Sequence, residues 1–253
     1  MAGPIYSVAK ALSLLEEIGR HPDGIRLSDI SAIFKLEKSS VFRILETLEN
    51  NGFIIKTSSP VRYMLGLKLF RLGMSKQSAM PFRRMAIPFL KELRDITGET
   101  AVLAAIESYD MFFLDTEDAF SMLRCSVDLS RTRPTLYDAL GKCLLAHNDD
   151  EYIVKYFKDK TQLEAAKNTG RKVDEIKKEL KRIKEAGYST DHGEKEAGIH
   201  SIAVPVKHLD VWAGACIGII YPACRYTPTR EKELIEKTKT VGRKLAEAAC
   251  LMK

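Results

Sequence analysis

LSDISAIFKLEKSSVFRILETLENNG, residues 27–52, is the stretch that decides the fold of the first part of this chain. It holds two short helical patterns that meet around residues 35–36. In the second pattern, one face carries apolar residues at helical spacing and would pack on a core: Val41, Ile44, Leu45 and Leu48. The opposite face carries short hydroxyls, basic groups, an aromatic ring and a carboxylate: Lys38, Ser39, Phe42, Arg43 and Glu46, with Ser40 at its border.

That outward face is typical of a helix that lies in the major groove of DNA. Short hydroxyls and basic groups near the helix N-terminus reach base edges, and an apolar group can contact a thymine methyl. A helix that is merely solvated would favour long charged residues and leave out Phe42. The stretch therefore predicts a helix-turn-helix that binds DNA, while a helix pair without such a role remains the alternative.

A long segment without acidic residues follows. No Asp or Glu occurs between Asn50 and Lys91, and the basic residues of the segment are Lys56, Arg62, Lys68, Arg71, Lys76, Arg83, Arg84 and Lys91. Such a run behind a DNA-binding helix predicts contacts with phosphates, although a basic surface that binds nothing is the alternative. Residues 53–55 and 63–65 are two strand patterns joined by a Ser-Ser-Pro turn, so we expect a wing with Lys56 and Arg62 at its tip.

Length and composition indicate two domains in an intracellular protein. A chain of 253 residues is too long for a lone DNA-binding module. Its start, MAGPIYSVAK, lacks the apolar run of a signal peptide, and no uncharged apolar segment is long enough to cross a membrane. We therefore expect a cytoplasmic protein without membrane contact.

The cysteines form no CxxC pair, which favours reduced thiols over a zinc site or disulfides. They are Cys125, Cys143, Cys216, Cys224 and Cys250.

From residue 100 onward the sequence predicts an α+β domain with an antiparallel sheet. Strand patterns cover residues 100–107, 111–117 and 121–127, and two more follow at 199–206 and 213–222. Asp138 is a good N-cap for the next helix, whose N-terminus could also hold an anion, although plain capping is the alternative. Residues 149–186 are charge-rich and helical, and a final helix starts at about Thr229.

The loop DHGEKEAG, residues 191–198, lies directly before a strand pattern, where a small molecule could be enclosed. Asp191, His192 and Glu194 bring metal binding or acid–base chemistry into consideration. Their spacing matches no metal motif, and no catalytic partner set can be assembled around them. We therefore expect no enzyme activity, no catalytic residue, no metal and no cofactor.

Several of these motifs resemble the IclR family of bacterial transcription regulators. The resemblance begins at Ser7-Val8-xx-Ala11-Leu12, continues through KSSVFRILETLENNGFI, YMLGLKLFRLG and DALGKCLLA, and ends in GEKEAGIHSIAVPV, residues 193–206. The family usually shows Thr in place of Ser40 and Tyr in place of Phe42. The resemblance implies a winged helix-turn-helix domain in residues 1–66, a linker helix in 67–80 that helps to pair subunits, and a GAF-like effector-binding domain in 81–253.

The resemblance also implies a small effector, often a carboxylic or aromatic acid. The family's pocket positions fall here on Cys125, Ala139, Leu140, Asp191, Ile199, Ser201, Gly218 and Ile220. Members that bind small keto acids carry hydroxyls where this chain has Gly218 and Ile220, which favours a larger or more apolar effector. For each of these residues ordinary core packing is the alternative.

We therefore expect a ligand-responsive DNA-binding transcription regulator, a homodimer or homotetramer that binds a palindromic operator in double-stranded DNA. The residues expected to contact DNA are Lys38, Ser39, Ser40, Phe42, Arg43, Lys56 and Arg62. The alternative is a metabolite-sensing protein that acts through protein partners, with the winged domain as a docking surface. The acid-free basic segment argues against that alternative.

Overall fold

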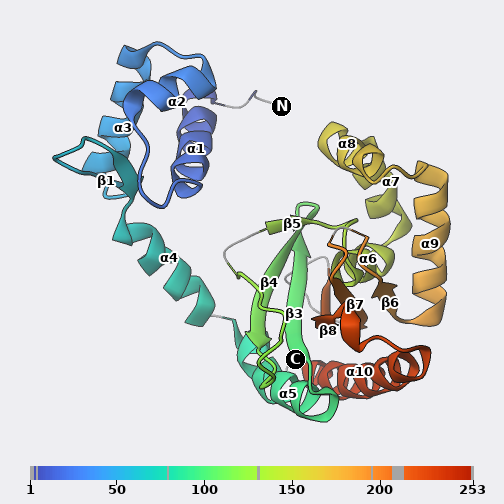
Figure 1. Ribbon diagram of the computed structural model, residues 1–253. Helices are drawn as coiled ribbons and strands as arrows, with labels where there is room; N and C mark the ends of the chain where they lie inside the picture. The colour runs from blue at the N-terminus through green and yellow to red at the C-terminus, as the bar shows by residue number, and fades with distance from the viewer. Residues whose placement is uncertain are drawn as a thin grey trace. The chain divides into compact units, whose positions relative to one another are not determined.

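The computed structural model describes residue 3 and residues 5–78, 80–129, 132–194, 196–206 and 214–251. The chain forms two compact units, residues 1–80 and 81–253, which are described separately below (Figure 1). Among the described residues, no helix is long and apolar enough to span a membrane.

The first unit is a three-helix head with a two-stranded antiparallel wing, which confirms the predicted winged helix-turn-helix. Lys35 adopts the left-handed conformation, with φ of 50°, and so ends α2 and turns the chain into α3. The core of the head is formed by apolar residues of all three helices and both strands. The elements are α1 (Tyr6–Gly19), α2 (Leu27–Phe34), α3 (Lys38–Asn50), β1 (Ile54–Lys56), β2 (Tyr63–Leu65) and α4 (Leu67–Ser78).

The predicted two-faced character of α3 is confirmed by burial. Val41, Leu45 and Leu48 are buried in the core of the head, and Ile44 is half-buried against it. Because these positions recur at helical spacing, the opposite face of α3 remains open to solvent. The linker helix predicted for residues 67–80 is α4, which ends at Ser78; Ala79 lies outside the described residues.

The second unit is built on a six-stranded antiparallel sheet with the strand order β5-β4-β3-β8-β7-β6. This arrangement confirms the predicted α+β class. Its elements are α5 (Pro81–Thr97), β3 (Thr100–Glu107), β4 (Asp110–Glu117), β5 (Thr132–Pro134), α6 (Ala139–Ala146), α7 (Asp150–Lys158), α8 (Lys160–Asn168), α9 (Val173–Ala186), β6 (Ser189–Asp191), β7 (Ile199–Val206), β8 (Ala215–Pro222), the 3-10 helix η1 (Ala223–Arg225) and α10 (Pro228–Cys250).

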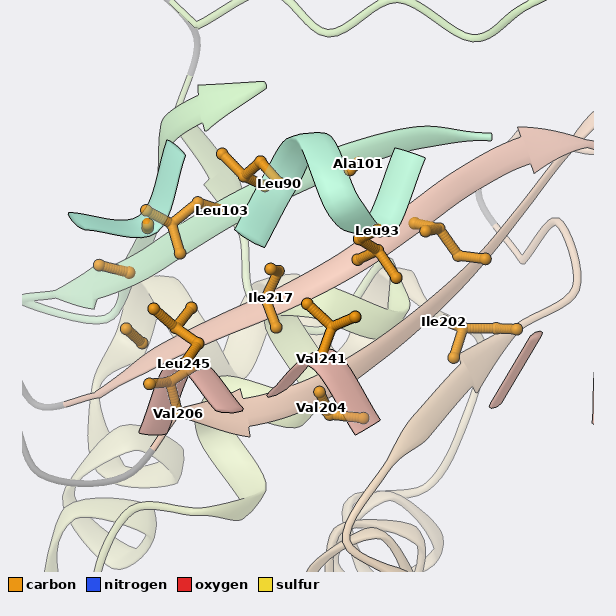
Figure 2. Close-up of a cluster of buried hydrophobic side chains, with 14 of the residues drawn as sticks. Leu90, Leu93, Ala101, Leu103, Ile202, Val204, Val206, Ile217, Val241 and Leu245 are labelled. Atoms are coloured by element: carbon orange, nitrogen blue, oxygen red, sulfur yellow. The ribbon is translucent and has the colours of Figure 1, made fainter. Parts of the chain in front are cut away.

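Helices cover both faces of this sheet. Leu90 and Leu93 of α5 and Val241 and Leu245 of α10 pack on one face around Ile217 of β8 (Figure 2). On the other face, residues of α6 pack against alternate residues of β3, β4 and β8. Because both faces are covered, the central strands are continuous apolar runs rather than alternating ones, and every residue of β8 is buried.

One element prediction was wrong. Residues 121–127 form no strand, because their polar groups bond to other elements: the carbonyl of Cys125 accepts from Thr100 Oγ1 at 2.7 Å, and that of Leu123 accepts from Arg225 at 3.0 Å. The charge-rich segment 149–186 is helical as predicted, and it is divided into α7, α8 and α9, with N-caps of the last two at Asp159 and Lys172. The last helix, predicted from about Thr229, begins at Pro228, where the side chain of Thr227 accepts from the Arg230 N–H at 3.1 Å.

We expect Leu90→Ala to destabilise the second unit by about 2–5 kcal/mol, since Leu90 is fully buried between α5 and the sheet. Urea unfolding followed by circular dichroism measures the change. Leu251→Ala is the matched control, because this leucine is exposed. Equal unfolding midpoints for the two variants would contradict the proposed core.

Candidate functional site: a DNA-binding face and an enclosed pocket

The outward face of α3 presents all of its predicted DNA-binding residues to solvent. Lys38, Ser39, Ser40 and Arg43 are exposed, and the side chain of Phe42 is 44% exposed although it is aromatic. The first turn of α3 holds no acidic residue. Positive side chains therefore add to the partial positive charge of the helix N-terminus, which is the end that a helix-turn-helix directs at DNA.

The two predicted wing residues differ in their surroundings. Lys56 is exposed at the end of β1. Arg62 is half-buried, and its Nη1 donates to the carbonyl oxygen of Gly24 at 2.7 Å, which ties the wing to the turn after α1. Thr57 closes the wing, because its hydroxyl donates to the Pro60 carbonyl at 2.6 Å and accepts from the Arg62 N–H at 2.9 Å. Arg62 therefore has a structural role in addition to any contact with DNA.

Two residues of the acid-free basic segment have partners within their own units. Lys68 donates to the carbonyl of Asn51 at 2.9 Å and lies over the ring of Phe53. Arg83 belongs to the second unit, where it forms an ion pair with Asp115 at 3.0 Å and donates to the Leu114 carbonyl at 2.8 Å. Arg83 thus connects α5 to β4 within the second unit.

The second unit has a small, partly open pocket beside the N-terminus of α6. Its volume, counted as the space open to the centre of a water molecule, is about 40 Å³. Its lining residues come from the loop after β4, the turn before α6, the loop before β7, and strands β6, β7 and β8: Cys125, Ser126, Val127, Tyr137, Asp138, Asp191, Glu196, Ile199, Ser201 and Ile220.

Five of the eight residues predicted for the effector pocket lie together in this lining: Cys125, Asp191, Ile199, Ser201 and Ile220. The other three are buried in the surrounding core. Ala139 and Leu140 pack in α6 against the sheet, although the Ala139 N–H donates to Ser201 Oγ at the pocket, at 3.2 Å. Gly218 sits in β8, where an added Cβ would lie 2.3 Å from the carbonyl oxygen of Ile202.

Sequence reasoning missed five lining residues. Ser126 and Val127 lie in the segment that was wrongly predicted as a strand. Asp138 was correctly predicted as an N-cap, since its Oδ1 accepts from the Gly141 N–H at 2.8 Å. Its position in the pocket lining depends on how α6 packs on the sheet. Glu196 lies in the loop 191–198 that was predicted to enclose a small molecule, but it was not singled out there, and no sequence signal pointed to Tyr137.

The polar side of the pocket is acidic. Its lining includes the carboxylates of Asp138, Asp191 and Glu196 and, among the residues that the structure describes, no Lys, Arg or His. Two N–H groups at the start of α6 already donate within the protein, one to Ser201 and the other to Asp138. The polar side of the pocket therefore mainly offers hydrogen-bond acceptors to a ligand.

Buried Cys143 and half-buried His147 lie close together, but their geometry does not support a nucleophile with its base. The Sγ of Cys143 lies 3.9 Å from Nδ1 of His147, and that same nitrogen contacts the carbonyl oxygen of Cys143 at 2.9 Å. Cys143 is fully buried. Within the part of the chain that the structure describes, no three His, Cys, Asp or Glu residues are grouped to hold a metal ion.

Comparisons with known proteins agree with both units. The model of the bacterial transcriptional regulator IclR C-terminal domain matches residues 74–247, and that of the IclR helix-turn-helix domain matches residues 7–57. The HTH-type transcriptional regulator KdgR of Escherichia coli is 27% identical over 242 residues, which cover 96% of this chain and 92% of that protein. TtgV of Pseudomonas putida, also an HTH-type transcriptional regulator, is 27% identical over 238 residues, or 93% and 88% of the two chains.

Solved structures share the fold. A putative IclR transcriptional regulator from Silicibacter has a TM-score of 0.79 at 23% identity, with 96% of each chain covered. An IclR homolog from Microbacterium hydrocarbonoxydans, complexed with 4-hydroxybenzoate, has a TM-score of 0.73 at 18% identity and covers 97% of this chain and 99% of its own. The curated relatives are named as regulators of transcription, not as enzymes.

We expect Gly218→Ser to destabilise the protein by about 1–3 kcal/mol rather than to restore a pocket hydroxyl, because the added side chain would collide with the backbone of β7. Urea unfolding measures the loss. Ile220→Ser, at a position that lines the pocket, is the comparison variant. A Gly218→Ser protein as stable as the wild type would contradict the packing described here.

Proposed function

The chain belongs to the IclR family of bacterial transcription regulators, and on that premise we propose how this DNA-binding regulator works: a dimer or tetramer binds a palindromic operator and responds to a small organic acid. The exposed face of α3 is the observation that carries the proposal. The protein would act in the cytoplasm, where bacterial DNA lies.

The proposed DNA contacts start from α3. Lys38, Ser39, Ser40 and Arg43 would contact base edges or adjacent phosphates, and Phe42 would meet a thymine methyl. From the wing, exposed Lys56 would contact the backbone. We assign Arg62 a supporting contact, because one of its guanidinium nitrogens already donates to Gly24.

Exposed apolar side chains on α1 and α4 support pairing of two copies. Leu67 and Phe70 of α4 are 84% and 68% exposed, and Tyr6 and Leu12 of α1 are also largely exposed. Several large exposed apolar side chains on two helices of one unit are typical of an interface. A second copy is the proposed occupant, since a symmetric dimer would present two heads to the two halves of a palindrome.

The pocket beside α6 is the proposed effector site. Cys125, Val127, Ile199 and Ile220 would contact the apolar part of the effector. The carboxylates on the polar side favour an acid that also carries hydroxyl or other donor groups, because a bare carboxylate there would meet like charges. Effector binding would shift the population between states that differ in affinity for DNA, to the extent that it binds those states differently.

The experiment that tests this function is a fluorescence-anisotropy titration of the purified protein with its upstream intergenic DNA and a scrambled duplex, at two salt concentrations. We expect tighter binding to the upstream DNA, and a preference that persists at the higher salt concentration. Steep salt dependence would distinguish DNA binding from action through protein partners, because counterion release scales with phosphate contacts. Absence of binding to either duplex would favour protein partners.

We expect Arg43→Ala to weaken operator binding by about 1–3 kcal/mol and to relax specificity at one base pair, if Arg43 binds a guanine through two hydrogen bonds. Competition with single-base operator variants measures the specificity. Arg182→Ala on α9 is the matched control, since Arg182 is exposed in the second unit. Equal weakening on all DNA sequences would instead make Arg43 a phosphate contact.

We expect Phe70→Glu to convert the dimer into monomers, because it places a charge in the proposed apolar interface of α4. Sedimentation velocity at one fixed concentration measures the change. Phe120→Glu, at an exposed phenylalanine in the second unit, serves as the control. A Phe70→Glu protein that sediments like the wild type would remove α4 from the interface.

A further inference from the structure

Lys142 is a buried cation close to the pocket. It lies on α6, and its side chain is only 1% exposed. Its Nζ donates to Glu179 of α9 at 3.1 Å and to Glu194 in the loop between β6 and β7. Arg171 joins the same cluster, with Nη1 2.6 Å from Glu179 and 3.7 Å from Glu194.

A lysine in such a place must be well paired, because burial of an unpaired charge is costly. Burial alone would lower the pKa of Lys142, but the hydrogen bond to Glu194 and the charges of Glu179 and Glu194 outweigh it and raise the pKa. Lys142 is therefore charged at neutral pH. An apolar residue of similar volume often stabilises a buried position at least as well as an ion pair does. The ion pairs of Lys142 therefore suggest a function beyond packing.

The ion pairs connect two sides of the pocket. The start of α6 forms one side, where Asp138 caps the helix and lines the cavity. Asp191 lines the other side, and its Oδ1 accepts from the N–H of Glu194 at 3.0 Å. Because Lys142 holds the side chain of Glu194, it connects α6 to the loop that begins at Asp191.

We propose that Lys142 is a positioning residue of the effector pocket, which holds the Asp191–Glu194 segment against α6 through its ion pair with Glu194. The proposal rests on the proposed function, because it takes this pocket as the effector site. It adds a residue that touches no effector but sets where a pocket carboxylate lies.

Two variants test the proposal by hydrogen–deuterium exchange of the full-length protein. Lys142→Met removes the cation, and Glu194→Gln removes the loop's charge while keeping its shape, so that it remains informative if the first variant does not fold. We expect exchange in a peptide covering residues 189–194 to be faster by roughly tenfold or more, with α5 and α10 unchanged. Lys184→Met is the matched control, because Lys184 pairs with Asp150 on the neighbouring α7 and not with the loop.

A second readout reports on the pocket itself. Cys125 lines the cavity together with Glu196 and Ile199, whereas Cys224 and Cys250 are exposed. Iodoacetamide labelling followed by mass spectrometry should show faster alkylation of Cys125 in Lys142→Met and in Glu194→Gln. The alkylation rates of the two exposed cysteines should not change. Unchanged exchange and labelling, or equal acceleration over the whole second unit, would overturn the positioning role. Neither readout uses DNA or an effector, so failure of this proposal is distinguishable from failure of the proposed function.

Discussion

Burial of one antiparallel sheet on both of its faces is the constraint on which the second unit depends. Strand β8 lies between β3 and β7, and all of its residues are buried. With α5 and α10 on one face and α6 on the other, the side chains in the middle of the sheet are mostly apolar. Polar groups gather instead at the N-terminus of α6, where Asp138 and Ser201 accept from its first N–H groups, and this is where the pocket forms.

The charges of the two units suit different partners. The outward face of α3 carries Lys38 and Arg43 beside a helix N-terminus, which suits a polyanion. The described lining of the pocket carries three carboxylates and no cation, which suits a ligand with hydrogen-bond donors. Buried Lys142 does not change that balance, because its charge is already directed at Glu179 and Glu194. A net charge of +6 therefore describes neither site.

Sequence patterns correctly predicted the features that depend on residues close together in the chain. The helical spacing of Val41, Leu45 and Leu48 was sufficient to orient α3, and the cap at Asp138 followed from its side chain. Features that depend on distant contacts were missed. Residues 121–127 have strand-like composition but bond to Thr100 and Arg225, and Arg83 lies in a basic run but pairs with Asp115 across the fold. Gly218 sits in the predicted strand, yet the proximity of Ile202 gives it a packing role that no spacing rule reveals.

The central claim is that the outward face of α3 recognises an operator. It is tested most directly by incubating the purified protein with fragmented genomic DNA of its source organism and sequencing the fragments that the protein retains. We expect a few strongly enriched fragments that share an inverted repeat. The centres of the two half-sites should lie a whole number of helical turns apart, which is roughly 10 base pairs or a multiple of that distance. Uniform recovery of fragments in proportion to their length, lost as salt rises, would mean that the basic surface binds DNA without sequence recognition and would contradict the claim.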